Sequence, residues 1–134
     1  MLIENHKRIV HECTQALQWA IDKGIEDKQT TIGFNCSLIA VNILEIYLHK
    51  NNLLKVDNVL KHEWFASKNK VNEKIDFEFD RKREILELMH DIEERRNILC
   101  YGKKQKFEEI NSILEKMYAL KKIFKELGVD DESH

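Results

Sequence analysis

The sequence contains no proline and only four glycines among its 134 residues. β-Sandwiches and β-barrels depend on these residues for their many tight turns, so the composition argues against both and favours a bundle of helices with short connections. No apolar run reaches about 18 residues, and we therefore expect no membrane span. The opening residues also lack the basic-then-apolar order of a secretory signal.

The sequence also has few cysteines and a small net charge. The three cysteines lie far apart and form no C-x-x-C pair, which predicts reduced thiols in a cytoplasmic protein and no zinc signature (Cys13, Cys36 and Cys100). The formal net charge is −2 and the pI is about 6.3. This balance argues against a protein that coats DNA, but it leaves room for a local basic patch.

The apolar residues that are present recur at three- and four-residue steps, as in amphipathic helices. They predict four long helices, over about residues 3–23, 30–50, 80–101 and 107–127. A threonine, Thr30 or Thr31, is the expected N-cap of the second helix. We expect a short helix after Asp57, a loop over 67–74 and a frayed tail over 130–134. Residues 1–134 thus predict one all-α domain, an antiparallel four-helix bundle with one additional short helix.

The second predicted helix is apolar nearly all round, which is typical of a helix at the centre of a bundle or in a subunit interface. Its one polar strip consists of Asn42, Glu45 and His49, at three- and four-residue steps. Two interpretations remain open. The strip is the wet side of a central helix, or it lines the same groove as Arg96, a residue of the third long helix.

Arg96 interrupts the apolar stripe of the third long helix. Projected at about 100° per residue, it falls within roughly 40° of the centre of the stripe, whereas Arg95 falls on its edge. The Arg96 guanidinium should therefore point into a packed face, a groove or an interface, where it needs an anionic or polar partner. That partner is either an interior acid, for which Glu45 is available, or a phosphate of a ligand.

The segment from Arg96 to Gly102 closes this long helix, and it is preceded in the chain by an apolar helix with an internal glutamate. In this respect the chain resembles the HEPN domain, a helical-bundle family that includes RNA-cleaving toxins of prokaryotic toxin–antitoxin pairs. The family signature is an arginine, usually followed by Asn, Asp or His, with a histidine four to six residues after the arginine. Arg96 and Asn97 match its first two positions, and Tyr101 occupies the histidine position.

The resemblance implies metal-independent RNA cleavage through the ribose 2′-hydroxyl, with two copies of the motif facing each other in a homodimer. Arg96 would bind the phosphate, and Asn97 would orient a ribose or a side chain. The residue at position 101 would transfer the proton of the 2′-hydroxyl or polarise that group. A tyrosine, with a reference pKa of about 10, is a poor base at neutral pH. The alternative is a non-catalytic HEPN-like module that binds RNA or a nucleotide, or that partners a small nucleotidyltransferase.

Other motifs give weaker signals. Three lysines follow the Arg96 segment, either as a solvated loop or as contacts for a polyanion backbone (Lys103, Lys104 and Lys106). Trp64 and Phe65 could stack on bases, or they anchor a core. Glu87 and His90 form a single Glu-x-x-His pair, whereas a di-metal bundle needs two such pairs and two further glutamates. We therefore expect no metal and no cofactor.

Overall fold

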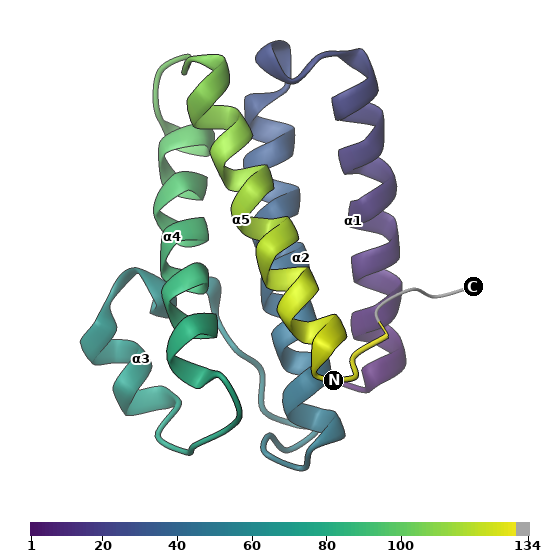
Figure 1. Cartoon of the computed structure of the whole chain (residues 1–134), viewed down its shortest axis with the longest axis vertical. Coiled ribbons are helices and arrows are strands. Elements are labelled where there is room, and N and C mark those ends of the chain that lie inside the picture. Colours follow the sequence, from purple (N-terminus) through teal and green to yellow (C-terminus); the bar gives the residue numbers. More distant parts are fainter. Residues whose placement is uncertain (131–134) are drawn as a thin grey trace.

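The computed structural model describes residues 1–130 and is all-helical over that range, with no strand (Figure 1). Its five α-helices are α1 (Ile3–Lys23), α2 (Gln29–Lys50), α3 (Lys68–Lys74), α4 (Lys82–Tyr101) and α5 (Phe107–Glu126). Two short 3₁₀-helices, η1 (Ile25–Asp27) and η2 (His62–Ala66), lie in the connections. The expected all-α class is confirmed. The expected frayed tail, apart from Asp130, lies outside the described residues.

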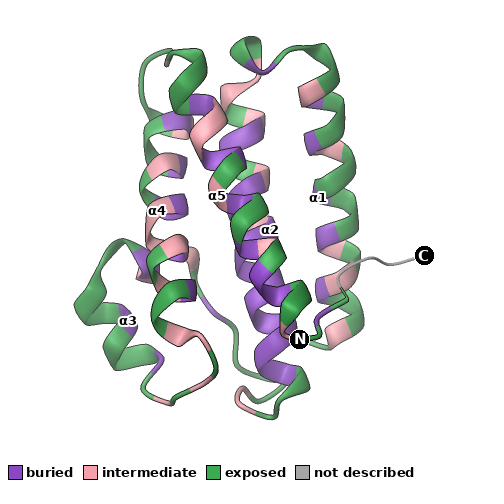
Figure 2. Ribbon diagram, viewed as in Figure 1, coloured by how far each residue is buried: buried purple, intermediate pink, exposed green. Residues whose placement is uncertain are grey.

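The four long helices run alongside one another, and consecutive ones alternate in direction (Figure 1). Helix α2 contacts α1, α4 and α5 and therefore occupies the centre. Every residue from 39 to 49 is buried, and Figure 2 shows the buried colour along most of α2. The central position predicted for this helix is confirmed.

Helix α2 also corrects the expectation that no apolar segment is long enough to cross a membrane. By length and composition alone the helix is a candidate span, but 83% of its most apolar window is buried inside the bundle. Burial by neighbouring helices already removes this apolar surface from water, as in the core helix of a soluble protein.

The outer helices bury one face each. Helix α1 directs Val10, Cys13, Leu17 and Ala20 inward, and α5 does the same with a stripe that begins at Ile110. Burying one such large apolar side chain stabilises the fold by about 1.5–3 kcal/mol. The apolar faces of α1 and α5, which the sequence pattern predicts to be buried, therefore pack in the core.

The contact between α2 and α4 is especially close at Gly33. A Cβ atom on Gly33 would lie 3.0 Å from Leu99 Cβ and 3.2 Å from Cys100 Sγ. The absence of a side chain at Gly33 allows the end of α4 to pack tightly against the beginning of α2. This contact fixes the position of the Arg96 segment.

Three local expectations were wrong. Thr30 and Thr31 lie inside α2, whose N-cap is Lys28. The segment 67–74 is not a loop: α3 forms there because Ser67 Oγ accepts a hydrogen bond from the N–H of Lys70, at 3.2 Å. The short helix expected after Asp57 is the 3₁₀-helix η2, which begins five residues later.

Candidate functional site

Arg96 lies in the last turns of α4 and is 7% exposed, as its place in the apolar stripe predicted. Its Nη1 donates to Asn97 Oδ1 at 3.3 Å. The guanidinium carbon lies 5.8 Å from the centre of the Phe34 ring and 5.6 Å from that of Tyr101. Helices α2 and α4 thus supply an aromatic ring each to one buried cation.

No carboxylate of residues 1–130 lies within 4.0 Å of the Arg96 guanidinium. Glu93, one turn earlier on α4, receives the Nδ1–H of His62, which lies 3.0 Å from both carboxylate oxygens. Glu45 instead accepts a hydrogen bond from the backbone N–H of Leu60, at 2.8 Å. The interpretation of Arg96 as the ion-pair partner of Glu45 is therefore wrong.

The side chains around Arg96 form a partly apolar surface. Tyr101 is 76% exposed and Phe34 is 47% exposed, and Ile98 is also exposed on the same turns of α4. Asn97 is exposed beside them. Aromatic rings at the surface next to a cation offer both a stacking face and a positive charge.

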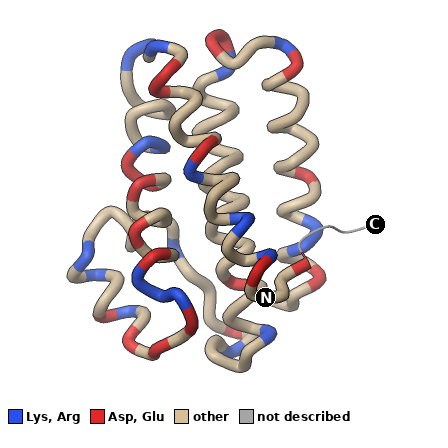
Figure 3. The backbone as a smooth tube through the Cα atoms, in the orientation of Figure 1, with Lys and Arg blue, Asp and Glu red and all other residues tan. Residues whose placement is uncertain are grey.

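The three lysines of the α4–α5 loop are exposed, and Lys104 forms an ion pair with Asp27 at 3.5 Å. Within the described chain neither Lys103 nor Lys106 has a carboxylate within 4.0 Å. Figure 3 shows basic segments on this loop and acidic segments in the first turn of α5 directly after it. The loop is therefore a mixed surface with two unpaired lysines and not an extended basic patch.

Gln29, at the first residue of α2, holds this loop in place. Its Nε2 donates to the carbonyl oxygens of Leu99 and Lys103, at 3.1 and 3.2 Å, and its Oε1 accepts from the N–H of Gln105 at 2.7 Å. The sequence carries no signal for this role, because the bonded residues lie 70 to 76 positions further along the chain.

Two other candidate groups have roles inside the bundle. Arg95 is half-buried, as expected for the edge of the stripe, and its Nε donates to Ser112 Oγ on α5 at 2.7 Å. Phe65 is buried in the core, and Trp64 packs against it with its ring 5.5 Å from Lys74 Nζ. These contacts place Arg95 between α4 and α5. They place Trp64 and Phe65 against α3 and α4, so none of the three residues joins Arg96 in its surface.

The polar strip of α2 lies at the other end of this helix. Glu45 is eleven residues after Phe34, a separation of roughly 16 Å along a helix. Asn42, Glu45 and His49 are all buried, so they neither line the Arg96 site nor form a wet face. Both interpretations of the strip are therefore wrong.

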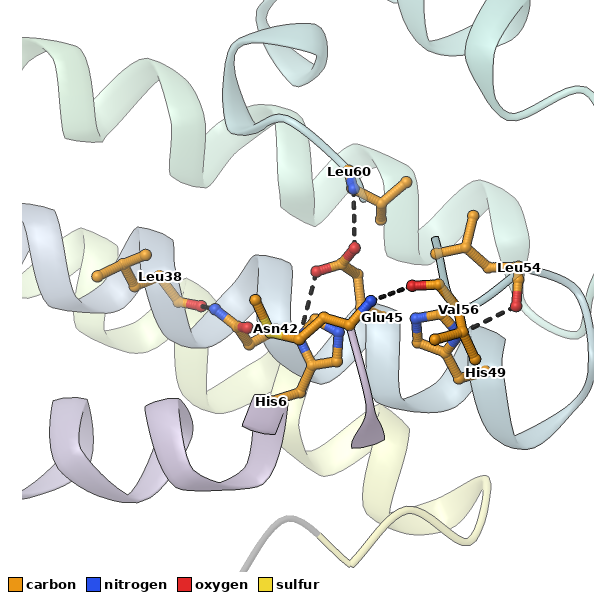
Figure 4. A network of polar contacts seen from close by, with 9 residues as sticks. His6, Leu38, Asn42, Glu45, His49, Leu54, Val56 and Leu60 are labelled. Carbon is orange, nitrogen blue, oxygen red and sulfur yellow. Dashed lines mark hydrogen bonds and ion pairs between the residues drawn. The ribbon is translucent and has the colours of Figure 1, made fainter. Parts of the chain in front are cut away.

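These three residues instead form a buried cluster with His6 of α1 (Figure 4). The Nδ1–H of His6 donates to Asn42 Oδ1 at 2.7 Å, and the same nitrogen lies 3.3 Å from Glu45 Oε2. The rings of His6 and His49 stack with centroids 5.4 Å apart. Burial lowers the pKa of His6 and raises that of Glu45.

The same cluster contains a group of potential metal ligands that the spacing of residues in the sequence did not predict. His6, Glu45 and His49 each offer one ligand atom, and the three atoms lie within 4.8 Å of one another. The sequence prediction included Glu45 and His49 but missed His6, although His6 lies four residues before Val10 and therefore on the apolar stripe of α1.

Comparison with protein-family models gives no match, and comparisons with characterised proteins and with solved structures give none either.

Proposed function

We propose that the protein binds RNA through the surface formed by Arg96, Phe34 and Tyr101. The observation that carries the proposal is a buried arginine that has two aromatic rings beside it and, among residues 1–130, no carboxylate within 4.0 Å of its guanidinium. A buried cation without a counter-charge is costly, and a ligand phosphate removes that cost through charge-assisted hydrogen bonds.

The two rings favour a nucleic acid over a simple anion. Tyr101 and Phe34 expose much of their surface, and bases stack on such rings with about 1–3 kcal/mol per base. Single-stranded RNA offers splayed bases together with phosphates, whereas a duplex hides its base faces. Lys103 and Lys106, on the loop that directly follows α4, are free to contact further phosphates.

The same proposal includes a HEPN-like assignment for the bundle, which rests on the Arg96–Asn97 motif at the end of α4. It also includes a two-fold homodimer, with the Arg96 end of α4 at or near the interface. A small nucleotidyltransferase is the partner that this assignment suggests. We place the protein in the cytoplasm, in agreement with its three free cysteines.

Metal-independent cleavage is the second candidate function. The observation in its favour is that the Tyr101 ring lies 5.6 Å from the guanidinium of Arg96, in the position of the family's histidine. The phenol could donate a hydrogen bond to the 2′-hydroxyl, but it is a weak base at neutral pH. Binding is therefore the primary proposal and cleavage the secondary one.

The experiment is a binding titration of fluorescently labelled single-stranded RNA in EDTA, followed by anisotropy, with a gel to detect cleavage. We expect the wild-type protein to bind and Arg96→Met to bind about 10–150-fold more weakly, the equivalent of 1.5–3 kcal/mol. Arg83→Met is the matched control, because the Arg83 side chain is 95% exposed and forms only a long ion pair with Glu87, at 3.7 Å. Equal affinities of wild type and Arg96→Met would contradict the proposal.

A further inference from the structure

We propose that His6, Glu45 and His49 form a binding site for a transition-metal ion, with Zn²⁺ as the expected occupant. The proposal does not rest on the RNA-binding function, because the site lies near the opposite end of α2 from Arg96. Its first observation is the one described above: two imidazole rings and a carboxylate from α1 and α2 gather their donor atoms within 4.8 Å.

The second observation is that each histidine has a buried nitrogen without a hydrogen-bond partner among residues 1–130. These atoms are Nε2 of His6 and Nε2 of His49, whose residues are 0% and 9% exposed. Buried polar atoms are nearly always satisfied, and each unsatisfied one costs about 1–3 kcal/mol. Two such atoms on adjacent, stacked rings therefore indicate a shared ligand.

Hydrogen bonds at Nδ1 determine the protonation of both rings. Asn42 donates its own Nδ2–H to the Leu38 carbonyl at 2.8 Å, so its Oδ1 is an acceptor, and His6 must carry its proton on Nδ1. The Nδ1 of His49 lies 2.9 Å from the carbonyl oxygen of Leu54, which can only accept. In the neutral rings both Nε2 atoms consequently carry the lone pair that a metal requires.

The carboxylate is held in the same way. Glu45 Oε1 accepts the backbone N–H of Leu60 at 2.8 Å, and this bond leaves Oε2 as the oxygen nearest the histidines. The two histidines thus use Nδ1 for an orienting hydrogen bond and keep Nε2 for a ligand, and Glu45 keeps Oε2, which lies 3.3 Å from Nδ1 of His6. Metal-binding histidines and carboxylates in proteins are oriented in this manner by surrounding groups.

The donor set and the spacing fit zinc. Zn²⁺ accepts imidazole nitrogen and carboxylate oxygen at about 2.0–2.2 Å, which in a tetrahedral site separates neighbouring ligand atoms by about 3.3 Å. The donors of His6, Glu45 and His49 need to close in by no more than about 1.5 Å from their separation of up to 4.8 Å. His49 also lines a surface cleft together with Leu53 and Leu54, so the site lies beside a solvent-filled depression.

A second group of potential ligands on α4 does not have these properties. His90 donates from Nδ1 to the Phe65 carbonyl at 2.8 Å, and its Nε2 already lies 3.1 Å from Glu94. Asp91, the third member of that group, pairs with Lys116 at 3.2 Å. All three side chains there have partners and none is buried, so the cluster at His6 is the stronger site.

A metal at His6, Glu45 and His49 would be structural. It would join the beginning of α1 to the end of α2, and through the orienting bonds of Leu54 and Leu60 it would also fix the connection after α2. Binding to the folded state alone raises the stability of the protein in proportion to the logarithm of metal concentration.

The test is a titration of untagged, chelator-treated protein with Zn²⁺ by calorimetry, and with Co²⁺ by visible absorption, which reports tetrahedral ligation. We expect one Zn²⁺ per chain and a higher melting temperature with Zn²⁺ than with Mg²⁺. His49→Phe should weaken binding by more than about 100-fold, and Asn42→Ala, which removes only an orienting bond, by about 10–100-fold. Circular dichroism of the metal-free variants establishes that they are folded.

The matched controls are His11→Ala, which removes an exposed histidine from the same helix as His6, and His90→Ala, which removes the competing group. Both should bind Zn²⁺ like the wild type, and so should Arg96→Met. A wild-type protein that binds no stoichiometric Zn²⁺, or full binding by His49→Phe, would overturn the proposal. Loss of binding in His90→Ala would overturn it as well. None of these results alters the RNA titration of Arg96→Met, so the two proposals fail separately.

Discussion

Replacing Arg96 by methionine separates a ligand-binding arginine from a structural one, because the two roles predict opposite effects on stability. Methionine retains the length and apolar body of the side chain while it removes the charge. The structure allows the effect on the free energy of unfolding to be worked out contact by contact. Only three contacts of the guanidinium are lost: the Asn97 hydrogen bond and the two aromatic rings.

The Asn97 bond is long, 3.3 Å, and stabilises the fold by about 0.5–1.5 kcal/mol at most. Each ring contact contributes about 0.5–1 kcal/mol at a partly exposed site. The desolvation of a buried cation that has no carboxylate beside it opposes these stabilising contacts, and it costs several kcal/mol in proteins. The two sides nearly cancel, so we expect Arg96→Met to change the free energy of unfolding by no more than about 1 kcal/mol.

Urea denaturation followed by circular dichroism measures this change, with Arg83→Met as the surface control. If an acid in the interior were paired with Arg96, the variant would strand a buried charge and lose about 3–5 kcal/mol. A loss of that size would refute the reasoning. Retained stability together with weakened RNA binding is the result that only a ligand-binding arginine produces.

Three further variants test the surroundings of Arg96. Gly33→Ala places a methyl group 3.0 Å from Leu99 Cβ, and it should lower the free energy of unfolding by about 1–3 kcal/mol in the same urea assay; unchanged stability would contradict the close helix contact. Tyr101→His supplies a base near neutral pKa, and we expect it to gain RNA cleavage in EDTA on a gel, whereas binding without cleavage would leave the protein a binding module. Burial raises the pKa of the Cys100 thiol, and the positive charge of Arg96 lowers it. Arg96→Met should therefore shift the pH dependence of Cys100 modification by a disulfide reagent to higher pH. An unchanged pH dependence would show that the Arg96 charge does not act on Cys100.

The helices were predictable because their signals are local. The bounds of α1 match the predicted span, since Gly24 ends an apolar repeat of three- and four-residue steps. The burial of Arg96 followed from the same periodicity, because the position of a residue on a helix face determines whether it faces the core. Helix α3 was missed because only one of its seven residues, Val71, is buried, so it has no repeating apolar pattern.

The partners of the polar residues were not predictable, because they depend on tertiary contacts. His6 and Asn42 are separated by 36 residues, and although the stripe of α1 includes His6, no local pattern identifies Asn42 as its partner. Glu45 and Arg96 violate the apolar pattern in a similar way, and opposite charges on two core helices suggest a pair. Their actual neighbours depend on how far along its own helix each residue lies, which periodicity does not encode.

The polar strip of α2 and Arg96 are both irregularities of core helices, and they lie at different levels along the axis of α2. Both violate the pattern of a core helix, but Phe34, which contacts Arg96, lies roughly 16 Å from Glu45 along the helix axis. Sites that far apart without shared partners contribute to stability almost independently. The two irregularities are therefore two sites with different chemistry. At one, a cation lacks a counter-charge; at the other, two imidazole nitrogens lack a partner. We propose an anion for the first site and a metal for the second, and each proposal is tested by its own titration.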